Sequence, residues 1–270
     1  MLTPIAIAAT IILRDGADVA AHRTLANGKE FDCVGAIGSG YPAGTCTLIK
    51  PNWVLTAGHV VYGMDAKKLR VRFSGKFYEV NRVVFHPDFC FGKKTTARSS
   101  FDLVGVDLAL IELKEKPDIN PAAINHSFEE KGQVGTLVGF GLYGMGLEGS
   151  RRPRYGVKSA GTNTIDCVGG IVNGELLPTR IMAADFDSPT NPELSKLGDS
   201  KPLPMEAIGS TGDSGGPVFI TVKGMQVLAG VLTACTIDRK QDVAKYGLYG
   251  CVNAWTRTSL YCEWIDRETH

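Results

Sequence analysis

Hydrophobic positions along this chain fall into short runs, and glycine, proline, aspartate or asparagine separates most of them. The runs are rich in β-branched and aromatic residues, a pattern typical of β-strands bounded by turns. We therefore expect an all-β protein. The predicted strands cover Val34–Ile37, Thr47–Ile49, Trp53–Thr56, Leu69–Phe73, Val80–Phe85, Leu108–Leu113, Thr136–Phe140, Arg180–Ala184, Pro217–Val222, Val227–Thr233 and Ala254–Arg257.

The predicted strands form two sets. The stretch 114–132 between the sets is rich in Pro, Asn, Lys and Glu, and we interpret it as a linker that crosses from one set to the other. Strand spacing alone predicts either a sandwich or a barrel. After the last strand, Ser259 is a suitable helix N-cap, so a short helix is predicted over Ser259–Arg267.

Composition narrows the class of partner. The 270 residues are enough for one large domain or for two small ones packed together. A formal net charge of +1 carries no electrostatic signature of nucleic-acid binding. No apolar run approaches the length of a transmembrane helix. We expect neither a nucleic-acid nor a membrane partner.

The amino-terminal region allows two interpretations. Leu2–Leu13 is largely apolar, and Ala6–Ala8 has the small-x-small pattern of a signal peptidase site. A secretory leader also needs a basic n-region, which Met1–Pro4 lacks. The segment is either the remnant of a leader or an apolar segment that packs on the folded body.

The cysteine content points to an oxidising compartment, because seven cysteines are many for a cytosolic enzyme. The protein is accordingly expected to be secreted or periplasmic. Since the count is odd, at least one thiol lies outside any intrachain pair. Cys33 and Cys46 lie on opposite arms of a predicted hairpin, and Cys235 and Cys251 flank a long loop. Each pair is either a disulfide or two buried thiols, and the sequence leaves both alternatives open.

Candidate chemistry comes from three segments far apart in the chain, Leu55–His59, Val106–Leu110 and Gly212–Pro217. A serine hydroxyl becomes a useful nucleophile when an imidazole takes its proton and a carboxylate orients that imidazole. Ser214 is the candidate nucleophile and His59 the candidate base. Asp107 is the candidate orienting acid, because it opens an apolar strand where a carboxylate is costly unless it is hydrogen-bonded.

Rival assignments are weaker. Asp102 lies in a less regular stretch than Asp107, and Gly198–Ser200 lacks the second glycine and the proline that follow Ser214. The Gly-x-Ser-x-Gly pattern also fits the nucleophile elbow of α/β-hydrolases. In those enzymes the histidine follows the serine, and here His270 is the one histidine that does so. The lipase and esterase interpretation is therefore set aside.

Four motifs together resemble the chymotrypsin/trypsin family of serine endopeptidases: LTAGH at His59, DLALIEL from Asp107, GDSGGP at Ser214 and AWTRTSLYCEWI over Ala254–Ile265. The resemblance implies two six-stranded antiparallel Greek-key β-barrels packed face to face, with a short C-terminal helix. It also implies three parts: an extension or activation segment over 1–29, a first barrel with linker over 30–130, and a second barrel with helix over 131–270.

The resemblance implies an endopeptidase that passes through an acyl-enzyme without a metal or organic cofactor. Its substrate would be a polypeptide, and a protein inhibitor is a further expected partner. The backbone N–H groups of Gly212 and Ser214 would form the oxyanion hole. The alternative is a catalytically silent relative that uses the barrels as a binding scaffold. Such relatives normally lose a triad residue, whereas all three are present here.

The resemblance also implies a substrate pocket, with Ile208 at its floor. The segment that forms the pocket wall is Ser-Trp-Gly in the family and Thr233-Ala234-Cys235 here. Because no acid stands at the floor, an apolar or small P1 residue is expected rather than Lys or Arg, although Glu206 nearby stays a candidate. Alignment places either Asn253 or Gly247 where a glycine usually keeps the pocket open. The implied pocket residues are Ile208, Thr233, Ala234, Cys235 and Asn253.

Activation in this family uses a new amino terminus, an Ile or Val whose ammonium pairs with the acid preceding the serine. That acid is Asp213 here, and Ile11 is the best available new terminus. If Asp213 instead pairs with an internal cation, no cleavage is needed.

Overall fold

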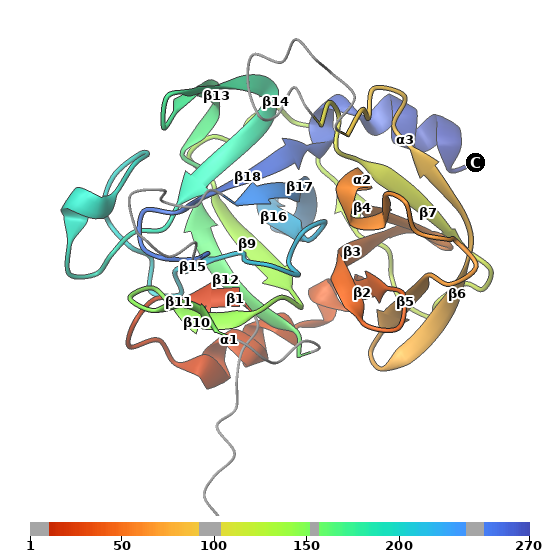
Figure 1. Cartoon of the computed structure of the whole chain (residues 1–270), viewed down its shortest axis with the longest axis horizontal. Coiled ribbons are helices and arrows are strands. Elements are labelled where there is room, and N and C mark those ends of the chain that lie inside the picture. The colour runs from red at the N-terminus through yellow and green to blue at the C-terminus, as the bar shows by residue number, and fades with distance from the viewer. Residues whose placement is uncertain (1–10, 92–103, 152–156, 236–245) are drawn as a thin grey trace, which may run out of the picture.

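The computed structural model describes residues 11–91, 104–151, 157–235 and 246–270. Strands dominate these residues, and Figure 1 shows them gathered into two halves with α3 (Cys262–Glu268) at the C-terminal end. No described helix is long and apolar enough to cross a membrane. All seven cysteines lie in the described residues, and the structure joins none of them by a disulfide, so both proposed pairings stay predictions.

The first half is a closed six-stranded barrel with the order β2-β3-β4-β7-β6-β5. Its strands follow the period-two rule: in β5, Val71 and Phe73 are buried, while the alternating Arg70 and Arg72 are partly exposed. Positive φ angles at Ser74 and Gly75 form the tight turn from β5 to β6. The strands are β2 (Val34–Gly38), β3 (Pro42–Lys50), β4 (Trp53–Thr56), β5 (Arg70–Phe73), β6 (Lys76–Phe85) and β7 (Ala109–Leu113).

The second half is an eight-stranded sheet with the path β12-β9-β16-β17-β18-β14-β13, with β8 paired to β17. The two ends of the path, β12 and β13, are separated in the chain by Ile165 and Asp166 alone, so the sheet curls round on itself. Its strands are β8 (Ala123–Ile124), β9 (Val134–Gly139), β12 (Ser159–Thr164), β13 (Cys167–Val172), β14 (Glu175–Asp185), β16 (Pro217–Val222), β17 (Met225–Cys235) and β18 (Val252–Arg257). The predicted pair of antiparallel barrels is confirmed at this level.

A small sheet, ordered β11-β10-β1-β15, lies beside the second half. Its strands are β1 (Ile11–Leu13), β10 (Tyr143–Met145), β11 (Gly149–Arg151) and β15 (Ala207–Ile208). All three residues of β1 are buried, so this part of the amino-terminal segment packs on the folded body. The remainder of that segment, residues 1–10, lies outside the described residues, and the proposed division into three parts stays a prediction.

The helix α1 (Val19–Ala26) was not predicted from the sequence. The Asp18 carboxylate caps its N-terminus by accepting from the N–H groups of Ala20 and Ala21. His22 on this helix is buried, and its Nδ1 lies 2.7 Å from the carbonyl oxygen of Ala160 on β12. Tertiary packing on the second half therefore holds this short helix.

The C-terminal helix is confirmed, but it begins later than predicted. A 3₁₀ turn over Thr258–Leu260 precedes α3, and Ser259 does not cap this helix. The Ser259 hydroxyl instead donates to Oε1 of Glu130 at 2.7 Å. The helix α2 (Gly58–Val61) is a single turn after β4, and two further 3₁₀ turns cover Lys29–Phe31 and Pro192–Leu194.

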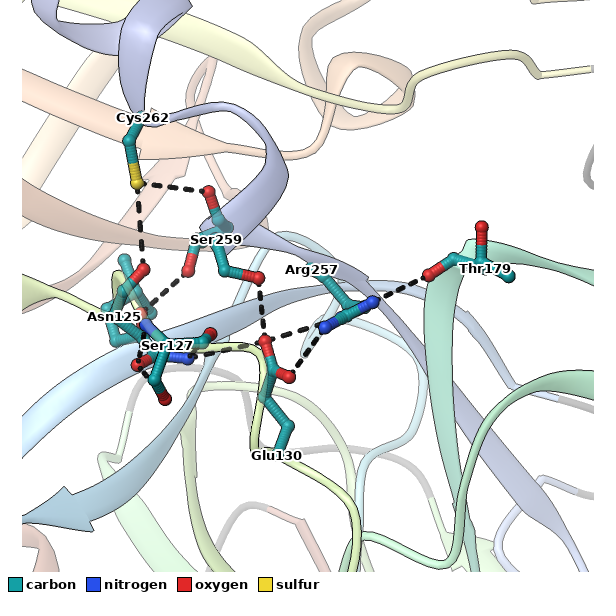
Figure 2. Close-up of polar contacts among 9 residues, drawn as sticks. Asn125, Ser127, Glu130, Thr179, Arg257, Ser259 and Cys262 are labelled. Carbon is teal, nitrogen blue, oxygen red and sulfur yellow. Dashed lines mark hydrogen bonds and ion pairs between the residues drawn. The ribbon is translucent and has the colours of Figure 1, made fainter.

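A buried ion pair ties the linker to the last strand, as Figure 2 shows. Arg257 donates from Nη2 to Oε2 of Glu130 at 2.7 Å and from Nε to Oε1 at 3.3 Å. Its Nη1 donates to the carbonyl oxygen of Thr179 at 3.0 Å, and Asn125 donates to Oε1 of Glu130. Both charges are almost fully buried, so this many hydrogen bonds are needed to offset their desolvation.

Candidate active site

His59 and Asp107 are joined twice. His59 Nδ1 lies 2.6 Å from Oδ2 of Asp107, and the His59 backbone N–H donates to Oδ1 at 2.8 Å. The His59 side chain is 23% exposed and that of Asp107 2%. Because the carboxylate holds the Nδ1 side of the ring, a neutral His59 with its proton on Nδ1 presents Nε2 as a proton acceptor.

Thr233 adds a third bond to this carboxylate from the other half of the molecule. Its hydroxyl donates to Oδ2 of Asp107 at 2.5 Å. Thr233 lies near the end of β17, whereas Asp107 precedes β7 in the first barrel. The acid is therefore satisfied by donors from both halves, which offsets the cost of burying it.

The turn that carries Ser214 is anchored on the first barrel. Thr45 on β3 donates its N–H to the Ser214 carbonyl at 2.9 Å and its hydroxyl to the Gly212 carbonyl at 3.1 Å. On the other side, the Gly215 N–H donates to the carbonyl of Leu232 at 2.8 Å. These bonds fix the turn between the two halves.

Glycine at position 215 lets this turn reach the strand that leads to His59. Its φ is +78°, and a Cβ there would lie 2.1 Å from Thr56 Oγ1 and 3.0 Å from the Ala57 nitrogen. Ser214 is thus brought beside the segment that carries His59. Between these two described residues no hydrogen bond joins hydroxyl and imidazole, and such bonds commonly tighten when substrate binds.

Two backbone N–H groups in the Ser214 turn have no acceptor among the described residues. The N–H groups of Asp213, Gly215 and Gly216 are all used in hydrogen bonds within the fold. Those of Gly212 and Ser214 donate to none of the residues that the structure describes. Gly212 has a φ of +94°, a conformation open to glycine. These are the two N–H groups expected to bind a developing oxyanion.

Asp213 is buried behind this turn without a described cation beside it. Its Oδ1 accepts from the Gly141 N–H and its Oδ2 from the Ser210 N–H, each at 2.8 Å. Burial raises the pKa of Asp213 to about 7, while these hydrogen bonds oppose the rise. The Asp213 carboxyl group therefore takes up a proton more readily than an exposed carboxyl group does.

A chain of hydrogen bonds links Ile11 to Asp213 through Leu142 and Ser210. The Ile11 N–H donates to the carbonyl of Leu142 at 3.2 Å, and the Ser210 hydroxyl donates to the same carbonyl at 3.0 Å. That hydroxyl is also 3.5 Å from Oδ2 of Asp213. Ile11 has a φ of 101°, which is strained for a β-branched residue.

Of the residues expected to line the substrate pocket, Ile208 and Asn253 are buried, whereas Thr233, Ala234 and Cys235 are partly exposed. Ile208 is fully buried in a cluster with Ile12, Phe186, Tyr249 and Cys251. Ile208 therefore belongs to a buried cluster, and its place at the floor of the pocket stays a prediction.

Asn253 stands directly across from Cys235 in the β17–β18 pairing, with Ala234 opposite Ala254. Asn253 Oδ1 accepts from the Gly209 N–H at 2.6 Å, and Nδ2 donates to the Gly209 carbonyl at 3.2 Å. The asparagine is fully buried. Of the two alignments, this geometry favours the one that places Asn253, not Gly247, at this position.

Sequence reasoning named Glu206 but missed three acidic residues that the structure groups with it: Asp166, Asp185 and Asp187. Burial is the largest cause that raises their pKa values, to about 7 for Asp166, about 6 for Asp187 and about 8 for Glu206. One carboxylate oxygen on each of Asp185, Asp187 and Glu206 is buried without a hydrogen bond.

Glu206 therefore belongs to this acidic group, and its Oε2 accepts from the Leu203 N–H at 2.8 Å. The sequence feature that could have revealed this group is Asp185. This acid ends an apolar strand, much as Asp107 begins one. In the described ranges, no three His, Cys, Asp or Glu side chains are arranged to hold a metal ion.

Comparison with known proteins places this geometry in a family. The profile of the Trypsin family matches residues 22–191. An uncharacterised peptidase of Corynebacterium glutamicum (strain R) is 24% identical over 236 residues, covering 84% of this chain and 64% of the relative. The chain thus spans less than two thirds of that relative.

Two animal proteins are similarly distant. Serine protease SSP1 of Scolopendra subspinipes is 25% identical over 250 residues, covering 84% of this chain and 73% of the relative. Chymotrypsin-like elastase family member 1 of Bos taurus is 26% identical over 247 residues, covering 82% and 77%. With a closed barrel, a second curled sheet and a profile match over more than half of its length, this chain belongs to the trypsin family.

Proposed function

We propose that this chain is a serine endopeptidase with Ser214 as nucleophile, His59 as general base and acid, and Asp107 as the orienting carboxylate. The observation that carries the proposal is the His59–Asp107 pair, held at 2.6 Å and braced from the second half by Thr233. The Ser214 turn, docked on the strand that leads to His59, supports the same assignment.

In the proposed reaction, Ser214 Oγ attacks the scissile carbonyl carbon while His59 Nε2 takes the hydroxyl proton. The carbonyl oxygen becomes an oxyanion that the Gly212 and Ser214 N–H groups bind. The intermediate collapses, the C–N bond breaks, and His59 returns the proton to the leaving amine. Water, activated by His59, then hydrolyses the acyl-Ser214 ester and regenerates the serine.

The proposed substrate is a polypeptide with a small residue at P1. Asn253 bridges to both backbone groups of Gly209, opposite Cys235, and so takes up room that a bulky P1 side chain would need. Buried Ile208 offers no charge to a Lys or Arg side chain. The acid nearby, Glu206, is engaged in a separate buried group.

The proposal extends to activation by a new amino terminus at Ile11, whose ammonium would pair with Asp213. The hydrogen-bond chain through Leu142 and Ser210 supports this, because it links the Ile11 nitrogen to the carboxylate. Extracytoplasmic location and control by a protein inhibitor belong to the same proposal and rest on the cysteine content and the family.

The deciding experiment is labelling with a fluorophosphonate probe, together with hydrolysis of a peptide library. The active parent should be labelled and should cleave peptides, whereas Ser214→Ala should do neither while keeping its melting temperature. The loss in turnover should be about 10⁴-fold or more. Activity of the variant within tenfold of the parent would remove Ser214 from the mechanism. A parent that folds but neither labels nor cleaves would instead favour the catalytically silent binding scaffold.

A further inference from the structure

Thr45 on β3 is fully buried and lies where several parts of the proposed active site meet. Its N–H donates to the Ser214 carbonyl at 2.9 Å. Its carbonyl oxygen accepts from the hydroxyl of Thr56 at 2.8 Å, on the strand that leads to His59. Both contacts use the backbone of position 45, so they do not need a threonine there. What the threonine adds is its hydroxyl group.

The Thr45 hydroxyl takes part in two hydrogen bonds of its own. It donates to the Gly212 carbonyl at 3.1 Å and accepts from the Phe140 N–H at 3.2 Å. The direction of both bonds is fixed, because a backbone N–H can only donate and a carbonyl oxygen can only accept. Among the residues that the structure describes, no second donor reaches the Gly212 carbonyl.

This contact matters because Gly212 supplies one of the N–H groups of the proposed oxyanion hole. Gly212 has a φ of +94° and no side chain, so its own backbone bonds rotate easily. The peptide group that joins it to Asp213 is held at both ends. Its carbonyl accepts from the Thr45 hydroxyl, and its N–H donates to the Ser210 carbonyl at 3.0 Å. A peptide group held in this way limits rotation at Gly212 and keeps the Gly212 N–H in one direction.

We propose that the Thr45 hydroxyl positions the oxyanion hole from the opposite half of the molecule, an inference that rests on the proposed function. Thr45 is a positioning residue, since it acts through Gly212. Without the hydroxyl, the Gly212 N–H spends less time aimed at the substrate. The substrate carbonyl is neutral when it binds and becomes charged in the transition state, so the loss falls on kcat more than on KM.

The test compares two substitutions of Thr45 in steady-state kinetics with one peptide substrate. Thr45→Val keeps the shape of the side chain but lacks the hydroxyl, and Thr45→Ser keeps the hydroxyl. In Thr45→Val, kcat should fall by about 10- to 100-fold while KM stays within about twofold of the parent. Labelling by a fluorophosphonate probe should slow by a similar factor. Thr45→Ser should restore most of both rates.

Thr258→Val is the matched control. The Thr258 hydroxyl is also buried and also donates to a carbonyl, that of Leu228 at 2.7 Å, but it lies outside the proposed site. Each valine substitution should lower the melting temperature, because each leaves a buried carbonyl without its donor. The loss of kcat should appear in Thr45→Val and not in Thr258→Val. If Thr45→Val does not fold, Thr45→Ala takes its place.

The outcomes separate this inference from the proposed function. If the parent is active and Thr45→Val keeps its kcat, or loses no more than Thr258→Val does, the positioning role is wrong and the peptidase assignment stands. A higher KM at unchanged kcat leads to the same conclusion. A folded parent that neither cleaves peptides nor reacts with the probe would overturn both.

Discussion

Thr233 and His59 share one oxygen of Asp107. The Thr233 hydroxyl lies 2.5 Å from Oδ2 and His59 Nδ1 lies 2.6 Å from the same atom. Since Thr233 comes from the second half and His59 from the first, the orientation of the base depends on how the two halves meet. Thr233 is therefore a positioning residue for the proposed triad.

Replacing this hydroxyl should slow the reaction. Thr233→Val removes one hydrogen bond to a charged group, commonly worth about 1.5–3 kcal/mol, so kcat/KM should fall by about 10- to 100-fold. Thr233→Ser keeps the hydroxyl and should retain most of the activity. Steady-state kinetics with one peptide substrate, alongside melting curves, separates this effect from lost stability. Equal rates for the valine and serine variants would count against the positioning role.

Removing the Asn253 side chain should widen the range of accepted P1 residues. Asn253→Gly frees the space beside Gly209 and Cys235, so the ratio of kcat/KM for Phe over Ala at P1 should rise by about tenfold or more. Peptides that differ at P1 alone provide the measurement. Asn253→Ala, which keeps a Cβ, should give a smaller rise. An unchanged ratio in a folded Asn253→Gly variant would show that this asparagine does not limit P1.

Activation at Ile11 predicts a difference between two forms of the protein. Material beginning at Ile11 should be about 100-fold more active than material that retains Met1, because the ammonium–Asp213 pair would fix the Gly212 amide. Amino-terminal sequencing of active material identifies the form. Asp213→Asn should reduce the Ile11 form to the activity of the Met1 form. Full activity with Met1 in place would mean that Asp213 has another partner.

The acidic group predicts lower stability at high pH. The pKa of Glu206 is about 8 in the folded protein, above the value of about 4.3 expected in an unfolded chain. The folded state therefore binds the proton more tightly, so this stabilisation is complete below pH ~4 and is lost as the pH rises through ~8. Asp166 and Asp187, raised to about 7 and about 6, act in the same direction.

Glu206→Gln does not ionise, so its melting temperature should match the parent's near pH 4 and exceed it at pH 8.5. Thermal melts across this range provide the measurement. Glu263→Gln, at an exposed position on α3 outside this acidic group, serves as control. The melting temperature of this control variant should equal that of the parent at every pH. A parent and a Glu206→Gln variant with the same pH dependence would refute the role of Glu206.

Strand positions were largely predictable because apolar alternation and turn residues act locally. Trp53–Thr56 and Pro217–Val222 have the bounds expected from the sequence. The helix α1 escaped prediction because packing on β12, rather than a strong local pattern, supports it. Asp102, the rival acid, lies outside the described residues.

A candidate site residue could be predicted where its type and its immediate sequence neighbours were enough to identify it. An acid at the head of an apolar strand pointed to Asp107, and the same reasoning applied to the end of β14 would have found Asp185. The brace from Thr233 and the bridge from Asn253 to Gly209 depend on contacts between distant strands. Such contacts become visible when the halves are assembled in three dimensions.

The pairing of Glu130 with Arg257 has a consequence during synthesis. The two residues are 127 positions apart, so the Glu130 carboxylate has left the ribosome long before its counter-ion is made. Until then a charge destined for the interior has no partner there, and water must keep it solvated. The linker can dock in its final place once β18 brings Arg257, so this part of the fold forms only after that strand has been made.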